Sequence, residues 1–128
     1  MKLILDSGGI GALAGQRARL AELRRRNVWP PVVPAVVMTE CLTGDHRQDF
    51  HENQLLRMCR ILPVTESIAR AAALLRTSTG RASAISATDA IVVAFAIDLT
   101  DVVILTSDPV DLADLVNTQA VAVTISPV

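Results

Sequence analysis

Four carboxylates stand at positions where acidic side chains can do chemistry: Asp6, Glu40, Asp89 and Asp108. Asp6 directly follows the apolar run of residues 2–5, and Asp108 comes two residues after the apolar run of residues 102–106. Both runs are predicted strands, and ligands of open α/β sheets bind beyond the carboxyl ends of the strands. Both carboxylates are therefore expected at a binding site. Each residue can also act as a helix N-cap, and the Pro109 that follows Asp108 is typical of a helix start.

The other two acids lie on apolar helices. Asp89 belongs to SATDAIVVAFAIDL, a predicted helix that is apolar on almost every face and is therefore expected to be buried. Glu40 projects from the apolar stripe of AVVMTECL, and no basic residue lies between Arg26 and Arg47 to pair with it. Two plainer interpretations stay open. Asp89 can belong to a capping box that begins at Ser86, and Glu40 can be a solvated surface residue.

The charge distribution indicates what would neutralise these acids. All twelve basic residues lie between Lys2 and Arg81, whereas residues 82–128 contain six aspartates and no lysine or arginine. Four converging carboxylates repel one another unless cations are present. A divalent ion is the predicted neutraliser, and oxygen-only ligands favour Mg²⁺ or Mn²⁺ over zinc. His46 and His51 are expected on different faces of a polar helix, at the surface rather than in a metal site.

Apolar runs and turn signals predict the elements that position the acids. Strands are expected at residues 2–5, 32–34, 61–64, 102–106 and 121–125. Helices are expected at residues 8–26 (in two pieces, because glycines weaken the first part), 35–42, 47–59, 66–77, 86–99 and 109–116, and residues 80–85 form a loop. Strands that alternate with helices predict an α/β fold. We expect a three-layer α/β/α sandwich with a mostly parallel central sheet of four to five strands.

Length and composition limit the possible classes of protein. The 128 residues are 51% hydrophobic with a mean hydropathy of +0.42, which predicts a single domain over residues 1–128 and excludes a disordered chain. Only Trp29, Phe50 and Phe95 are aromatic, too few for platforms that stack nucleic-acid bases. No signal peptide begins MKLILD, and the longest apolar run is too short to span a bilayer. We therefore expect a soluble, cytoplasmic protein in which Cys41 and Cys59 are reduced and buried as small apolar side chains.

Four segments together resemble the PIN domain family, and most closely its VapC-type toxins of bacterial toxin–antitoxin pairs. They are LILDSG with Asp6, VVMTECL with Glu40, SATDAIVVAFA with Asp89 and VILTSDPVDL with Asp108. The resemblance implies an endoribonuclease that depends on Mg²⁺ or Mn²⁺, a homodimer, and a small VapB-like antitoxin that blocks the site. One departure is that Asp6 is followed by Ser7-Gly8-Gly9, where the family commonly has two hydroxyl residues.

The resemblance assigns roles to these residues in the metal-assisted hydrolysis of RNA phosphodiester bonds. Asp6, Asp89 and Asp108 would hold the metal, and Glu40 would be a further ligand or would orient the attacking water. Ser7, Thr106, Ser107 and Asp111 are expected to support these ligands, and Asp111 can share the role of Asp108. The candidates for RNA contact are Arg17, Arg24 and Arg25, with Arg19, Arg26, Arg47, Arg57 and Arg60 as further basic residues.

Three other functions compete with the nuclease. Residues 9–14 (GIGALA) match the glycine pattern of dinucleotide-binding folds, but Asp6 would repel a pyrophosphate and no acid ends the second strand. A phosphoryl-transfer domain with an aspartate cluster would need a lysine near the late strand, and the only lysine is Lys2. The third alternative is an inactive PIN-like module that only binds a partner, with its carboxylates serving as helix caps.

Overall fold

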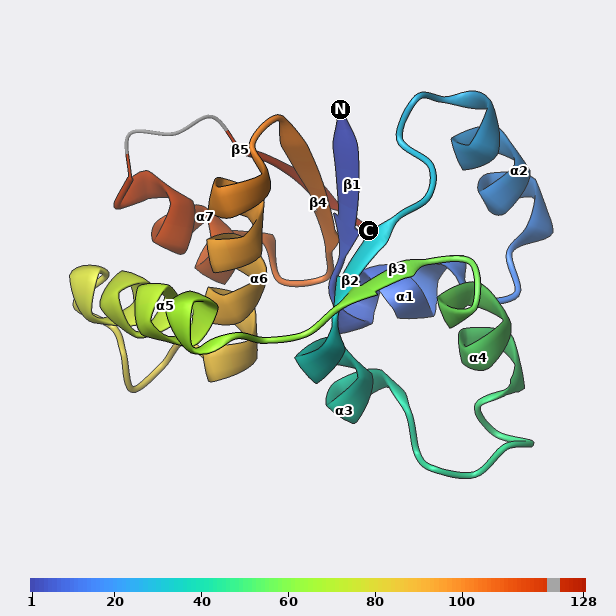
Figure 1. Ribbon diagram of the computed structural model, residues 1–128, viewed down its shortest axis with the longest axis horizontal. Coiled ribbons are helices and arrows are strands. Elements are labelled where there is room, and N and C mark those ends of the chain that lie inside the picture. Colours follow the sequence, from blue (N-terminus) through green and yellow to red (C-terminus); the bar gives the residue numbers. More distant parts are fainter. Residues whose placement is uncertain (120–122) are drawn as a thin grey trace.

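Five short strands form one parallel sheet in the order β3–β2–β1–β4–β5 (Figure 1). The computed structural model describes residues 1–119 and 123–128. Its strands are β1 (Lys2–Leu5), β2 (Val32–Pro34), β3 (Arg60–Leu62), β4 (Val102–Thr106) and β5 (Val123–Pro127). The first, second and fourth match their predicted ranges. The third begins one residue early and ends two residues early. The fifth extends two residues beyond its predicted end, and residues 121–122 of that prediction lie outside the described residues.

Helices follow the strands along the chain. They are α1 (Ser7–Leu13), α2 (Arg17–Arg25), the 3₁₀ turn η1 (Ala35–Val37), α3 (Met38–Cys41), α4 (Phe50–Leu56), α5 (Glu66–Ser78), α6 (Ala87–Leu99) and α7 (Pro109–Asn117). The predicted break within residues 8–26 is confirmed, because the chain turns at Gly15 with a φ of +74°. This is a left-handed conformation that glycine adopts without steric cost.

Two predicted helices were too long. The segment 35–42 is a 3₁₀ turn followed by only four α-helical residues, and the segment 47–59 is helical only from Phe50 to Leu56. Before α4, Oδ1 of Asp45 accepts hydrogen bonds from the backbone N–H groups of Arg47 (2.8 Å) and Gln48 (3.2 Å). Aspartate side chains that bind nearby backbone in this way compete with helix formation, so the helix starts later.

The sheet lies between two groups of helices. In Figure 1, α5, α6 and α7 lie on one side of the strands, and α1, α2 and α4 lie on the other. The predicted three-layer α/β/α architecture is therefore confirmed. The core is aliphatic: Ile4, Val33 and Ile104 of the strands are fully buried, as are Val92 and Val93 of α6.

Helix α6 is the central buried helix, as its apolar sequence predicts. Six of the seven positions from Ala90 to Ala96 are buried. The chain enters the helix through a cap in which Ser86 Oγ accepts a hydrogen bond from the backbone N–H of Asp89 (3.0 Å). This cap fixes the helix start beside the end of the sheet. The Ser86 cap, which the sequence offered as one interpretation of Asp89, is thus present. It uses the backbone N–H of Asp89, so the carboxylate of Asp89 can still serve the site.

Both cysteines are free and only partly buried, where the sequence predicted full burial. They pack against the edge of the core. Burial raises the pKa of both thiols to about 11, so that they stay protonated at neutral pH. Among the described residues, none of the helices has both the length and the apolar character that crossing a membrane would require.

Candidate active site

One cleft of about 270 Å³ gathers all four acids that the sequence singled out. Its lining residues are Asp6, Ser7, Glu40, Ala84, Ser86, Asp89, Ser107, Asp108 and Asp111. They come from the ends of β1 and β4, from α3, and from the first turns of α6 and α7. Because β1 and β4 are adjacent and parallel, their carboxyl ends meet at one edge of the sheet, which is where the sequence placed the site.

Asp6 is buried, with 4% of its surface exposed, and both of its oxygens accept hydrogen bonds. Oδ1 accepts from the backbone N–H of Gly9 (2.8 Å), which caps α1, and Oδ2 accepts from the hydroxyl of Thr106. The N-cap interpretation of Asp6 is therefore confirmed. It does not remove Asp6 from the cleft, because a carboxylate oxygen has two lone pairs and can accept a hydrogen bond and bind a cation together.

Three acids stand close enough to share one cation. Asp89, Asp108 and Asp111 each offer a carboxylate oxygen, and these oxygens lie within 4.8 Å of one another. Asp108 stands at the N-cap position of α7, as the sequence suggested, but its side chain makes no capping hydrogen bond and its carboxylate is available to the cleft. The backbone N–H of Asp108 instead donates to Thr106 Oγ1 (2.8 Å).

The electrostatics of the cleft favour a bound cation. Burial raises the pKa of Asp89 to about 7, and the hydrogen bond and charge of Asp108, with the charge of Asp6, act in the same direction. A carboxyl group held this way takes up a proton or a cation near neutral pH. The donors in the cleft are carboxylate and hydroxyl oxygens, which suit Mg²⁺ or Mn²⁺. The residues present therefore fit the divalent ion that the sequence predicts.

The geometry of the cleft places Asp111, rather than Glu40, beside the carboxylates of Asp89 and Asp108, the reverse of the order that the sequence suggested. Glu40 lines the cleft from α3 but is exposed, and it does not belong to the group of three oxygens described above. Asp111, which the sequence offered only as a residue that can share the role of Asp108, does belong to that group. Asp111 lies one helical turn after Asp108 on α7, so both carboxylates reach the same side of the cleft.

The two glycines after Asp6 allow α1 to approach β4 closely. A Cβ atom on Gly8 would overlap the side chain of Ser107, and a Cβ atom on Gly9 would lie 2.5 Å from the carbonyl oxygen of Leu105. The departure from the family pattern at Ser7-Gly8-Gly9 thus has a steric reason in this chain. Ser7 and Ser107 both line the cleft, and Thr106 is fully buried beneath it.

Arg81 is the residue that sequence reasoning missed. Its guanidinium lies beside the cleft, where Nη2 is 3.1 Å from Oδ1 of Asp111 and Nη1 binds Oδ2 of Asp114. The sequence analysis proposed only a divalent ion to neutralise the acids, but Arg81, which is 30 positions from Asp111 in sequence, is adjacent to it in space. The signal that could have found it is the spacing of Asp108, Asp111 and Asp114, which places three acids along one side of a helix.

The candidate RNA-contacting arginines separate into two groups. Arg17 and Arg24 of α2 line a cleft of about 660 Å³ together with Arg57, which directly follows α4. The structure does not bring Arg25 to this cleft. Arg25 is exposed and lies 3.5 Å from Glu22 on the same helix. His46 and His51 are both exposed, as expected.

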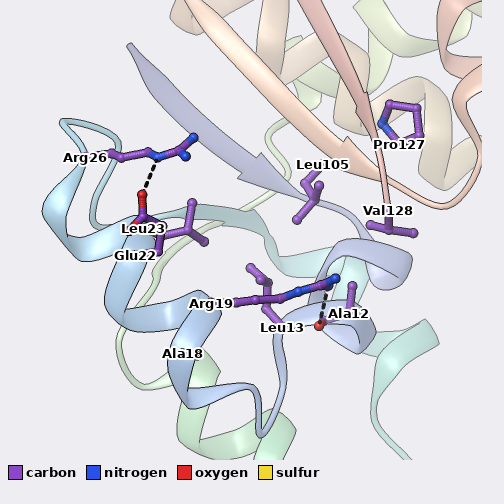
Figure 2. A pocket seen from close by; sticks show the side chains of 10 residues that line it. All are labelled: Ala12, Leu13, Ala18, Arg19, Glu22, Leu23, Arg26, Leu105, Pro127 and Val128. Carbon is purple, nitrogen blue, oxygen red and sulfur yellow. Dashed lines mark hydrogen bonds and ion pairs between the residues drawn. The ribbon is translucent and has the colours of Figure 1, made fainter.

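A separate apolar groove of about 450 Å³ lies beside α1 and α2, away from the acids (Figure 2). Leu13, Leu23 and Leu105 form part of its floor, and Val128 at the end of the chain closes one side. Arg19 and Arg26 stand at its edge, where Arg26 pairs with Glu22 (3.3 Å) and Arg19 reaches the carbonyl oxygen of Ala12 (3.5 Å). The groove therefore has an apolar floor and a mainly basic rim.

Comparison with known proteins gives one family and one fold. The family model described as PIN domain matches residues 6–115. No curated protein matches the chain.

Among solved structures, DNA-bound VapBC from Salmonella typhimurium superposes with a TM-score of 0.73 at 12% identity, covering 99% of this chain and 98% of that chain. VapBC2 from Rickettsia felis, bound to a promoter DNA fragment, gives 0.71 at 14% identity, with 100% and 99% covered. FitAcB from Neisseria gonorrhoeae gives 0.66 at 22% identity, with 95% and 96% covered. At these identities the likeness shows the fold.

Proposed function

Since the chain belongs to the PIN domain family, we propose that it is a metal-dependent endoribonuclease that hydrolyses RNA and acts as the toxin of a toxin–antitoxin pair. The observation that carries this proposal is the cleft at the carboxyl ends of β1 and β4. Four separate parts of the chain contribute acids to it, and three of their oxygens lie within 4.8 Å of one another. PIN domains are generally nucleases, and such a cluster is what metal-assisted hydrolysis of a phosphodiester needs.

The acids of the cleft would hold the ion. Asp89, Asp108 and Asp111 would hold it, because their oxygens lie within 4.8 Å of one another, and Asp6 and Glu40 line the same cleft. When bound, Mg²⁺ or Mn²⁺ supplies a more acidic water and neutralises charge on the scissile phosphate. Glu40 is the exposed acid on α3, so it is placed to accept a proton from an attacking water at the open side of the cleft. The hydroxyl of Thr106 accepts a hydrogen bond from the backbone N–H of Asp108 (2.8 Å) and would thereby help to orient that residue, and Ser107 lines the cleft beside it.

The arginine-lined cleft between α2 and α4 would contact the RNA backbone. None of Arg17, Arg24 and Arg57 forms an ion pair with a carboxylate in the part of the chain that the structure describes. Unpaired guanidinium groups bind phosphate well, and binding of this kind weakens with salt. Arg57→Gln should raise the KM for RNA several-fold. Arg70→Gln is a matched control on α5, because Arg70 pairs with Glu66 (2.9 Å) and lines neither cleft. An equal effect of both substitutions would refute this contact.

An antitoxin partner is supported by the structural neighbours, VapBC and FitAB, which are two-component complexes. The apolar groove of Figure 2 offers such a partner an apolar floor with a basic rim, which suits a segment that carries apolar and acidic side chains. Ala18→Arg would fill the groove from an exposed position on α2 and should abolish binding of a co-expressed antitoxin. Ala71→Arg, at an exposed position on α5, is the control. The homodimer and the cytoplasmic location stay predictions from the sequence.

Metal binding can be tested without substrate. Mg²⁺ or Mn²⁺ should raise the melting temperature of the wild-type protein, because a ligand that binds only the folded state stabilises it. Asp89→Asn should melt higher than the metal-free wild type and should respond less to the ion. If melts of the wild type with and without metal coincide, the acids do not form a metal site. The chain would then be a PIN-like module that only binds a partner.

A further inference from the structure

A single arginine joins the loop before α6 to the first turns of α7. The guanidinium of Arg81 binds two acids that lie one helical turn apart, Asp111 through Nη2 (3.1 Å) and Asp114 through Nη1. The three side chains are only partly exposed, with 44%, 21% and 39% of their surfaces accessible. A forked guanidinium that binds two carboxylates at once is held in a defined position, because both of its ends are fixed.

The loop that carries Arg81 is itself fastened to the protein. Arg76, near the end of α5, donates from Nε to the carbonyl oxygen of Ile85 (2.9 Å) and from Nη2 to that of Ala82 (2.7 Å). The backbone N–H of Ile85 in turn donates to the carbonyl oxygen of Arg81 (3.1 Å). The buried side chain of Ile85 anchors the same turn in the core. Arg81 is therefore presented to α7 by a loop with few ways to move.

Asp111 is shared between two cations of different kinds. One of its oxygens accepts the bond from Arg81, and the residue also belongs, with Asp89 and Asp108, to the group of acids that could hold a divalent ion. A guanidinium beside this carboxylate neutralises part of the charge that would attract the ion, and it also repels the ion directly. The arginine that stabilises the cluster without metal must therefore weaken its attraction for metal.

We propose that Arg81 is a positioning residue that competes with the divalent ion for Asp111 and so sets the affinity of the cleft for metal. This inference rests on the proposed metal site. With Arg81 in place, Asp111 is held at the side of the cluster, and Asp89 and Asp108 are left as the main ligands. Without Arg81, Asp111 is free to turn fully toward the ion, and the cleft gains one net negative charge.

Calorimetric titration with Mn²⁺ alone tests this competition. Arg81→Gln should lower the Kd for Mn²⁺ about tenfold, the order expected when one positive charge is removed a few ångströms from a divalent ion. Arg81→Lys keeps the charge, so its Kd should stay closer to that of the wild type. In an Asp111→Asn background, Arg81→Gln should lower the Kd clearly less than it does in the wild-type background, because the shared carboxylate is gone and only the direct repulsion between Arg81 and the ion is removed. Arg70→Gln, which removes an arginine from an ion pair outside the cleft, should leave the Kd unchanged.

The outcomes are distinguishable. A Kd for Mn²⁺ that is unchanged or higher in Arg81→Gln, in protein that gives the wild-type circular dichroism spectrum, would overturn the inference and leave the proposed function standing. An equal gain in affinity with and without Asp111 would also overturn it, because the effect would then be one of overall charge. No Mn²⁺ binding by the wild type or any variant would refute the metal site and the inference with it.

Discussion

The hydroxyl of Thr106, at the end of β4, donates a hydrogen bond to Oδ2 of Asp6, at the end of β1, across 100 positions of sequence. The same hydroxyl oxygen accepts from the backbone N–H of Asp108 (2.8 Å). One buried side chain thus ties together two of the acids of the cleft. Asp6 also caps α1, so the start of that helix, the two strand ends and the approach to α7 form one connected network.

Thr106→Val should therefore destabilise the fold and disturb the cleft. The substitution removes the hydroxyl that satisfies Asp6 and Asp108, and an unsatisfied buried polar group costs about 1–3 kcal/mol. Urea denaturation would measure the loss. Thr106→Ser keeps the hydroxyl, so it should retain most of the stability and the metal response. A loss in Thr106→Ser with none in Thr106→Val would show that packing of the methyl group matters and that the hydrogen bonds do not.

The stability of the metal-free protein should fall as pH rises from about 4 to 7. The pKa of Asp89 is raised to about 7, mainly by burial, so the folded state holds a proton that the unfolded chain has already released. Stability is then highest below the unfolded pKa of 3.8 and is lost as pH rises through the folded value. In EDTA, Asp89→Asn should remove about 1–3 kcal/mol of this dependence. Denaturation curves between pH 4 and 8 would measure it, and a wild-type curve without this fall would contradict the prediction.

Two alanine substitutions in one short helix should have opposite signs. Gly9→Ala places a Cβ atom 2.5 Å from the carbonyl oxygen of Leu105, so backbone must move, and we expect a loss of about 1–3 kcal/mol. A Cβ atom on Gly11 meets nothing within 4 Å. Gly11→Ala should therefore stabilise α1 by about 0.5–1 kcal/mol, because alanine favours the helix and restricts the unfolded chain. Thermal melts of both variants would measure the two effects. A Gly9→Ala variant that melts as high as wild type would show that the close approach of α1 to β4 does not require glycine at this position.

The loop that follows α3 should depend on Asp49. Its buried carboxylate accepts hydrogen bonds from the backbone N–H groups of Thr43 (3.0 Å) and Gly44 (2.9 Å) and from the Thr43 hydroxyl (2.8 Å). Burial acts to raise the pKa of Asp49, but these hydrogen bonds outweigh it and lower the pKa. The stabilisation is then present above pH 3.8 and is lost as pH falls. Asp49→Ala should melt lower than wild type at pH 7, and the gap should narrow toward pH 3. A gap that does not depend on pH would contradict this role.

The sequence predicted where the site lies in the fold better than it predicted which residues stand together there. Asp6 and Asp108 could be placed because each follows an apolar strand, and parallel strands end at one edge of the sheet. Asp89 could be placed because a helix that is apolar on almost every face is buried, and a buried carboxylate is costly unless it has a partner. Whether Asp108 caps α7 depended on a side-chain rotation that spacing does not determine. The structure turns the Asp108 carboxylate into the cleft instead.

What the sequence could not predict depends on contacts between distant segments. The pairing of Arg81 with Asp111 joins a loop to a helix that follows it by a whole helix and strand. The shortened α4 depends on Asp45, whose side chain binds the backbone N–H groups of Arg47 and Gln48 at the start of the predicted helix. The close packing at Gly9 becomes visible only when α1 and β4 are adjacent. In each case the deciding interaction is a tertiary or side-chain contact, which periodicity does not record.

Cleavage of a mixed total-RNA pool by the purified protein in Mg²⁺, in Mn²⁺ and in EDTA, with Asp89→Asn as the matched variant, would show whether the acidic cleft is a metal-dependent ribonuclease site. Asp89→Asn keeps the shape of the side chain and should fold at least as well as wild type, so it isolates the loss of the carboxylate. We expect discrete fragments that require metal and disappear in the variant. Cleavage that persists in EDTA or in Asp89→Asn, or no cleavage by antitoxin-free wild type in either metal, would contradict the account.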